Sequence, residues 1–259
     1  MNKTAIKNFA IWARQKLISD ITYKAGLLGV SIKGIAEPLP QSTKDLQLFD
    51  IGTKDYARVA GEQIKQRNAL VEAIQSKLND LDYASAFENV VEEVAYTWFN
   101  RLIAVRFMEV NDYLPGRVRL LSSENQFKHE PDLVTNPFDS DLTFSVFEQD
   151  LVISLKDENK LDELFRFLFV KQCNKLHDIL PELFEPTNDY TELLLTLSFT
   201  DKDDVVYRLT HDIDERDFNI SEVDDNGKPT GQVEIIGWLY QYYNNEPKAK
   251  VFADLKKKY

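Results

Sequence analysis

The sequence predicts a mainly α-helical fold, a multi-helix bundle arranged around a long central helix at residues 83–110. This stretch has no Gly or Pro, and 18 of its 28 residues are apolar when Ala and Tyr are counted. Apolar residues also recur at helical spacing through most of the remaining chain, whereas alternating strand patterns are short. The expected exception is a less regular region near 112–155, which could contain short strands.

The central helix should be about 40 Å long, because each residue adds 1.5 Å. Its apolar residues recur three and four positions apart and continue around the cylinder, so other helices should cover most of its surface. Its polar residues share one strip, except for Arg106, which lies almost opposite. An arginine in apolar surroundings needs a carboxylate or carbonyl partner, and we expect Arg106 to have one.

Before the central helix, residues 4–28 are expected to form an amphipathic helix that ends in a glycine-containing segment. Residues 30–52 are interrupted by Gly and Pro, which indicates a loop or a short 3₁₀ connection. Residues 57–78 return to helical spacing and follow a heptad pattern in which Arg67 occupies a seam position.

After the central helix, the Pro-Gly pair at 115–116 should stop the chain from continuing as a helix. Residues 117–121 alternate and could form a short strand, whereas residues 142–155 fit a strand or a helix. The later segments expected to be helical are 161–184, 190–197, 203–213, 232–244 and 247–258.

The net charge of −12 hides a strong asymmetry along the chain. Residues 1–129 carry 17 basic and 15 acidic groups, residues 130–234 carry 9 and 26, and residues 235–259 carry 5 and 2. An acidic middle would repel a phosphate backbone, so any nucleic-acid contact should come from the two ends. The alternative is that the acidic loops only keep the protein in solution.

The most basic surface is expected on the first helix, whose segment has five basic residues and one acidic residue. The candidate DNA contacts are Lys3, Lys7, Arg14 and Lys24. Basic side chains on one helix face suit the phosphate backbone, although such a face can also be simply solvated.

No motif for catalysis or metal binding stands out. The glycines form neither a dinucleotide-binding turn nor a P-loop. Cys173 and His177 are four residues apart but lack a second pair, and His129 and His211 are isolated, so no metal site is expected. The single cysteine excludes an internal disulfide, and no secretory signal or membrane span is evident, which favours the cytoplasm.

Four segments, together with the opening helix, closely resemble the N-terminal region of the PglX family of adenine-specific DNA methyltransferases from type 1 bacteriophage-exclusion (BREX) systems. They are EVAYTWFNRLIAVRFME (93–109), LFVKQCN (168–174), DYTELLL (189–195) and EIIGWLYQYY (234–243). The similarity extends over essentially all 259 residues. The family's catalytic Asn-Pro-Pro-Tyr motif is not matched, because Asn136-Pro137-Phe138 lacks the second proline, and we interpret it as a loop.

The resemblance implies that residues 1–259 are an N-terminal helical domain that precedes an absent methyltransferase domain. A subdivision into N-terminal helices at 1–111 and an acidic helical part at 112–259 is expected. The parent enzyme would use S-adenosylmethionine to methylate adenine N6 and so mark host DNA. This segment would hold no catalytic, cofactor-binding or metal-binding residue and would be inactive alone.

Three roles for the segment follow from the resemblance and the charge pattern. It could position DNA for the methyltransferase, or it could be a scaffold that docks other phage-exclusion subunits without DNA contact. It could also support the catalytic domain through an exposed apolar patch that includes Trp238, Tyr242 and Tyr243.

Overall fold

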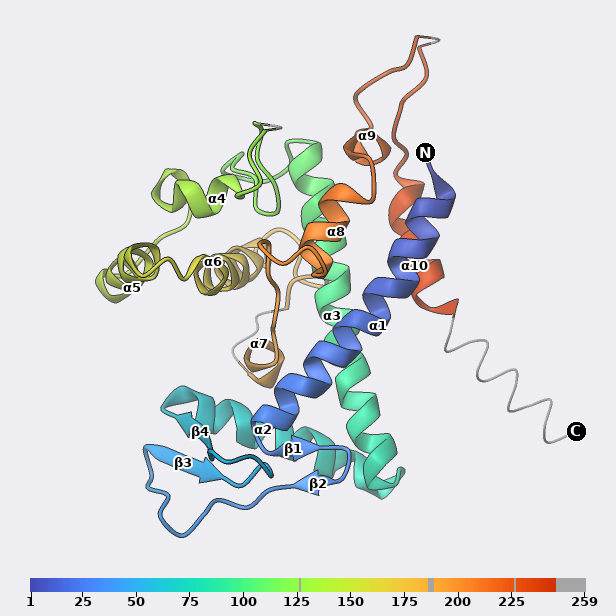
Figure 1. Ribbon diagram of the computed structural model, residues 1–259. Helices are drawn as coiled ribbons and strands as arrows, with labels where there is room; N and C mark the ends of the chain where they lie inside the picture. Colours follow the sequence, from blue (N-terminus) through green and yellow to red (C-terminus); the bar gives the residue numbers. More distant parts are fainter. Residues whose placement is uncertain (126, 186–188, 226, 246–259) are drawn as a thin grey trace, which may run out of the picture. The chain divides into compact units, whose positions relative to one another are not determined.

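The computed structural model is mainly helical, as the sequence predicts (Figure 1). It describes residues 1–125, 127–185, 189–225 and 227–245. Within these ranges, the strands form two small antiparallel sheets of two strands each. The chain divides into two compact units, which do not coincide with the expected subdivision at residue 111. Unit 1 contains residues 1–16, 99–184 and 197–259, and unit 2 contains residues 17–98 and 185–196.

Two long helices contribute residues to both units: α1 (Lys3–Leu27) and α3 (Tyr83–Val110). The bounds of α3 are those predicted for the central helix, since an uninterrupted apolar pattern of this length leaves few alternatives. Its apolar side chains are buried in both units, for example Phe87 and Val94 in unit 2 and Phe99 and Leu102 in unit 1.

Unit 2 contains the sheets and the helices that follow them. In one sheet β1 (Val30–Ser31) pairs with β2 (Gly34–Ile35), and in the other β3 (Leu46–Phe49) pairs with β4 (Ala57–Ala60). The chain continues into α2 (Glu62–Ser76) and the 3₁₀ helix η1 (Lys77–Asn79), and α7 (Tyr190–Leu193) packs against α2.

The helix predicted for residues 57–78 is wrong at its start. Ala57 and Val59 are buried while Arg58 and Ala60 are exposed, which is the alternation of a strand with one covered face. Gly61 then takes a positive φ of 57°, and only after this residue does the helix begin. The strands at 30–49 were missed because they are only two to four residues long and lie between Gly and Pro residues.

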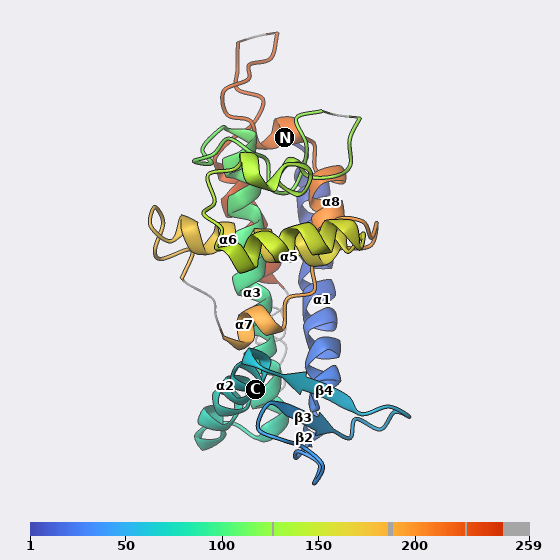
Figure 2. The ribbon, with the colours of Figure 1, turned by 90° about the vertical axis from the view of Figure 1, so that its left-hand side faces the viewer.

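Unit 1 is built from helices. They are α4 (Asp132–Thr135), the 3₁₀ helix η2 (Pro137–Asp139), α5 (Val146–Asp157), α6 (Leu161–Leu176), α8 (Val205–His211), α9 (Glu215–Phe218) and α10 (Glu234–Tyr243). Both α4 and α5 pack against α6, as Figures 1 and 2 show. The segment at 142–155, which fitted a strand or a helix, contains most of α5. A capping box formed by Ser145 and Glu148 begins this helix.

The strand considered at residues 117–121 is not formed. The backbone amides of Leu120 and Leu121 both donate to Oε2 of Glu109, each at 2.9 Å, so a carboxylate takes the donors that a strand partner would use.

The helix predicted to run to residue 184 ends at Leu176, and α9 was not predicted. The last predicted helix, 247–258, lies outside the described residues.

In the described ranges, no helix is both long enough and apolar enough to cross a membrane.

Candidate nucleic-acid interface

The part of α1 that belongs to unit 1 presents two lysines to solvent. Lys3 and Lys7 are exposed, whereas Ile6, Ala10 and Ala13 of the same helix are fully buried. At 100° per residue, Lys3 lies about 20° from Ala10 and Lys7 about 60° from it, so the two exposed lysines lie beside the buried face near the start of the helix and not opposite it.

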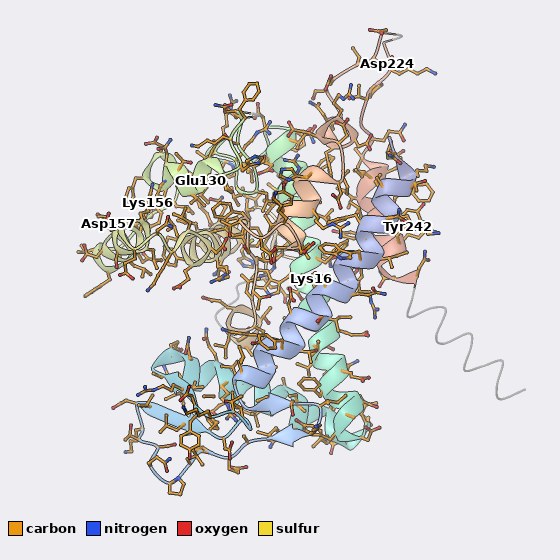
Figure 3. All side chains as sticks on the ribbon, viewed as in Figure 1. Lys16, Glu130, Lys156, Asp157, Asp224 and Tyr242 are labelled. Carbon is orange, nitrogen blue, oxygen red and sulfur yellow. The ribbon has the colours of Figure 1, made fainter. Side chains whose placement is uncertain are left out.

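Lys3 lies against an aromatic surface of α10. Its Nζ is 4.1 Å from the ring centroid of Trp238, which in turn stacks on Tyr242 with 5.8 Å between centroids. Both rings are half-buried, and Figure 3 shows Tyr242 on α10. A lysine over an indole ring gains about 0.5–1 kcal/mol at an exposed site. The contact therefore limits the motion of the Lys3 side chain and keeps its ammonium group at the surface.

The other two candidate DNA contacts are less accessible. Arg14 is only 8% exposed, and its guanidinium carbon lies 5.9 Å from the ring centroid of the buried Tyr243. Lys24 is half-buried and belongs to unit 2. The expected apolar patch is also smaller than predicted, because Tyr243 contributes to the core and not to the surface.

A further cation beside α1 was missed by sequence reasoning. The Arg208 guanidinium carbon lies 3.9 Å from the ring centroid of Trp12, and its Nε donates to Asp212 at 2.6 Å. Arg208 and Trp12 are on α8 and α1, almost 200 residues apart in sequence. No local pattern could have indicated this contact.

A polar cleft of about 600 Å³ lies elsewhere in unit 1. Arg106 lies in its wall and is 1% exposed. Its Nη1 donates to Glu109 at 2.6 Å and to Ser122 at 3.0 Å, and its Nη2 donates to Glu215 at 3.1 Å. The expectation that Arg106 has a carboxylate partner is confirmed, and it has two.

Glu215 joins Arg106 to a second arginine. Arg119 donates to both oxygens of Glu215, at 2.9 and 3.0 Å, in a bidentate pair. Burial raises the pKa of Glu215, but the Arg119 hydrogen bond and the Arg106 charge outweigh it and bring the pKa below its ordinary value. The arginines of this cleft are therefore already matched by carboxylates, and the cleft is a weak candidate for binding an anion.

The histidines that are isolated in sequence meet at this cleft. The rings of His129 and His211 stack with 5.7 Å between centroids, and His211 also stacks on Tyr207 at 3.9 Å. Among the described residues, no group of three or more His, Cys, Asp or Glu side chains is arranged to hold a metal ion.

The other residues that the sequence analysis considered as candidates interact with neighbouring groups of the protein. Cys173 is buried, and burial raises the pKa of its thiol to about 12, while the charge of Arg101 offsets part of this effect. His177 Nδ1 lies 3.1 Å from the carbonyl oxygen of Phe184. In the Asn-Pro-Phe segment, Phe138 packs edge to face against Phe144.

Over its full length the chain is similar to the N-terminal region of adenine-specific methyltransferases, which confirms the resemblance seen in its sequence. The adenine-specific methyltransferase PglX of Lacticaseibacillus casei (strain Zhang) is 44% identical over an alignment that covers 100% of the chain. The adenine-specific methyltransferase BrxX of Escherichia coli O9:H4 (strain HS) is 32% identical over 99% of it. The chain spans about a fifth of these relatives, 21% and 20% of their lengths. No protein-family model matches the chain.

Proposed function

We propose that this chain is the N-terminal accessory segment of a site-specific adenine-N6 DNA methyltransferase that serves in a phage-defence (BREX) system. The similarity of the whole chain to one fifth of two adenine-specific methyltransferases carries this proposal. The parent enzyme would use S-adenosylmethionine, and its catalytic and cofactor-binding residues would lie outside this segment. A methylation assay with adenine-containing duplex DNA should therefore show activity for the full-length protein and none for this chain.

Within the parent, the segment would help to position DNA through the exposed lysines near the start of α1. Lys3 and Lys7 are exposed there, and the Trp238 ring keeps the Lys3 ammonium group at the surface. Lysines that contact phosphates release counterions from the duplex, so this contact would be independent of base sequence and sensitive to salt.

Binding of the chain to a fluorescent duplex, measured at about 50 and 200 mM salt, tests this role. A Lys3→Glu/Lys7→Glu variant reverses the two exposed charges and should weaken binding at least about tenfold at low salt. Arg14 is left unchanged, because a glutamate at this buried position would disturb the core.

The matched control is Lys33→Glu/Lys44→Glu, which makes the same change in charge at two exposed lysines of unit 2. Equal losses in the two variants would mean that only net charge matters, and absence of binding at either salt would reject DNA contact by this segment.

The alternative is a protein–protein scaffold that docks other defence subunits without contacting DNA. The excess of acidic residues at 130–234, 26 against 9 basic ones, favours this role because such a surface repels phosphates and suits a basic protein partner. The same duplex assay separates the two roles, since a scaffold would show no binding to DNA at low salt.

A further inference from the structure

Helix α5 carries apolar side chains on two faces, of which only one is covered. Val152 and Leu155 are buried on the side that packs against α6. The rest of the helix surface exposes four large apolar residues. They are Phe147 (86% exposed), Val146 (72%), Ile153 (50%) and Leu151 (41%).

The exposed residues form an ordered pattern, which we call the α5 outer surface. At 100° per residue, Val146 and Ile153 make one apolar stripe and Phe147 and Leu151 make another. Between the stripes run Asp150, Ser154 and Asp157, all exposed. In Figure 2, α5 lies in front of α6, and Figure 3 labels Asp157 at its C-terminal end.

This exposure does not result from a weakly held helix. The capping box of Ser145 and Glu148 fixes the first turn, and Lys171 on α6 binds Glu148 with 2.6 Å between Nζ and Oε1. Near the other end, Nζ of Lys156 donates to the carbonyl oxygen of Thr135 at 2.6 Å. The helix is therefore anchored on its inner side while the four apolar side chains remain 41–86% exposed.

Four large apolar side chains on a helix of twelve residues are more than the scattered exposure that is normal for a surface. The two aspartates are seven residues apart, which places them about 10 Å from one another along the helix. A complementary partner must therefore offer an apolar surface with Lys or Arg side chains at a similar spacing.

We propose that the α5 outer surface docks onto the remainder of the parent methyltransferase, which would offer an apolar surface with basic residues opposite Asp150 and Asp157. This inference rests on the proposed function, because it requires a parent. The relatives have about four fifths of their length outside the region that this chain matches, and this remainder is large enough to cover the α5 outer surface. A second copy of the chain fits poorly, since twofold pairing of α5 would bring its acidic line onto itself.

The experiment uses cysteine labelling, because Cys173 is buried and burial raises the pKa of its thiol to about 12. A Ser154→Cys substitution places a thiol in the middle of the α5 outer surface, and a Ser76→Cys substitution places one at an exposed position of unit 2 as the control. Maleimide labelling rates are compared between the isolated chain and the full-length protein. We expect at least a tenfold slower rate at position 154 in the full-length protein, and no such change at position 76.

Adding Phe147→Ser and Leu151→Ser to the full-length Ser154→Cys protein should restore fast labelling, because these side chains, 86% and 41% exposed, belong to the α5 outer surface. Equal rates at position 154 in the isolated chain and the full-length protein would overturn the docking proposal. It would also be overturned if sedimentation showed the isolated chain to be a dimer that Leu151→Asp dissociates.

Methyltransferase activity of the same full-length protein is measured separately. If the full-length protein is active but position 154 is labelled as fast as in the isolated chain, only the docking proposal is rejected. If labelling at position 154 is slowed but the protein is inactive, only the proposed activity is rejected.

Discussion

Two of the buried arginines, one in each unit, are stabilised by hydrogen bonds to different kinds of acceptor. In unit 2, Arg67 on α2 is 3% exposed and donates to two backbone carbonyls, from Nε to Leu28 at 2.7 Å and from Nη2 to Ala36 at 2.8 Å. In unit 1, Arg106 on α3 is 1% exposed and donates to the carboxylates of Glu109 and Glu215. Both side chains tie a helix to a loop or to a short element.

The difference lies in what remains when the arginine is removed. Around Arg67 the hydrogen-bond acceptors are neutral, and its guanidinium stacks on Phe49 at 3.6 Å. Burial lowers the pKa of Arg67 to about 10, and the charge of Glu37 only partly opposes this. Around Arg106 the acceptors are charged, and the side chain of Glu109 is 0% exposed. Loss of Arg106 would therefore leave a buried charge, whereas loss of Arg67 would leave buried dipoles.

The largest effect is expected for Arg106→Met. It leaves the buried Glu109 carboxylate without its cation, which should lower the free energy of unfolding by about 3–5 kcal/mol. Urea unfolding followed by circular dichroism measures this loss. An Arg106→Met/Glu109→Gln double variant is the control, because it removes the charge as well and should recover part of the stability. A loss below about 1 kcal/mol in the single variant would show that the carboxylate is readily solvated once its cation is removed.

A smaller effect is expected for Arg67→Met, which keeps the apolar stem and removes the hydrogen bonds to Leu28 and Ala36. Hydrogen bonds from a charged donor contribute about 1.5–3 kcal/mol each. Removing the guanidinium also removes the cost of burying it, so we expect a net loss of about 2–3 kcal/mol in the free energy of unfolding. Urea unfolding measures it against Arg58→Met, an exposed position on β4. If Arg67→Met cost more than Arg106→Met, the distinction between neutral and charged acceptors would be wrong.

These two arginines also show how far the sequence could be used. The apolar periodicity around Arg106 was sufficient to predict that it needs a partner, and Glu109 is only one helical turn away. Glu215 is 109 residues distant, so only the tertiary fold brings it within reach. Arg67 was placed on a seam by its heptad position, but its acceptors are backbone carbonyls, which exist at every residue and leave no signal in the sequence.

The same reasoning explains the partial prediction of the α1 surface. Lys3 and Lys7 are exposed as predicted, but the spacing of apolar residues on α1 does not alone explain this, because Lys7 and Arg14 are seven residues apart and point in nearly the same direction. Arg14 is nevertheless buried at the border of the apolar face, and its guanidinium carbon lies 5.9 Å from the ring centroid of Tyr243 on α10. Whether a border residue is covered depends on the helix that packs beside it, and the sequence does not specify that packing.

The pair of Arg119 and Glu215 provides an intermediate case, because it is bidentate but partly open to solvent. The side chains are 18% and 41% exposed, so water can replace much of the lost interaction. We expect Arg119→Met to lower the free energy of unfolding by about 1 kcal/mol, well below the loss for Arg106→Met. Urea unfolding of the two single variants under the same conditions tests this order, and equal losses would mean that the network acts as one unit.

The smallest effect is expected for Glu148 and Lys171, whose side chains are 30% and 22% exposed and whose ion pair lacks the bidentate geometry of Arg119 and Glu215. The Lys171 hydrogen bond and the Ser145 backbone amide lower the pKa of Glu148 from about 4.5 to about 2. Between these values the folded state keeps the carboxylate ionised while the unfolded chain binds a proton, so the stabilisation is present above about pH 4.5 and is lost as the pH falls toward 2. Glu148→Gln should therefore cost about 1 kcal/mol or less at pH 7, since the pair is partly solvated, and almost nothing near pH 2.

Urea unfolding at pH 7, 4 and 2.5 measures this dependence, with Glu88→Gln at an exposed position of α3 as the control. A difference between wild type and Glu148→Gln that stays constant with pH would show that the glutamine changes the capping of α5 and not the charge. Protonation of Glu148 would then have no measurable effect on stability, as expected where water replaces much of the lost interaction.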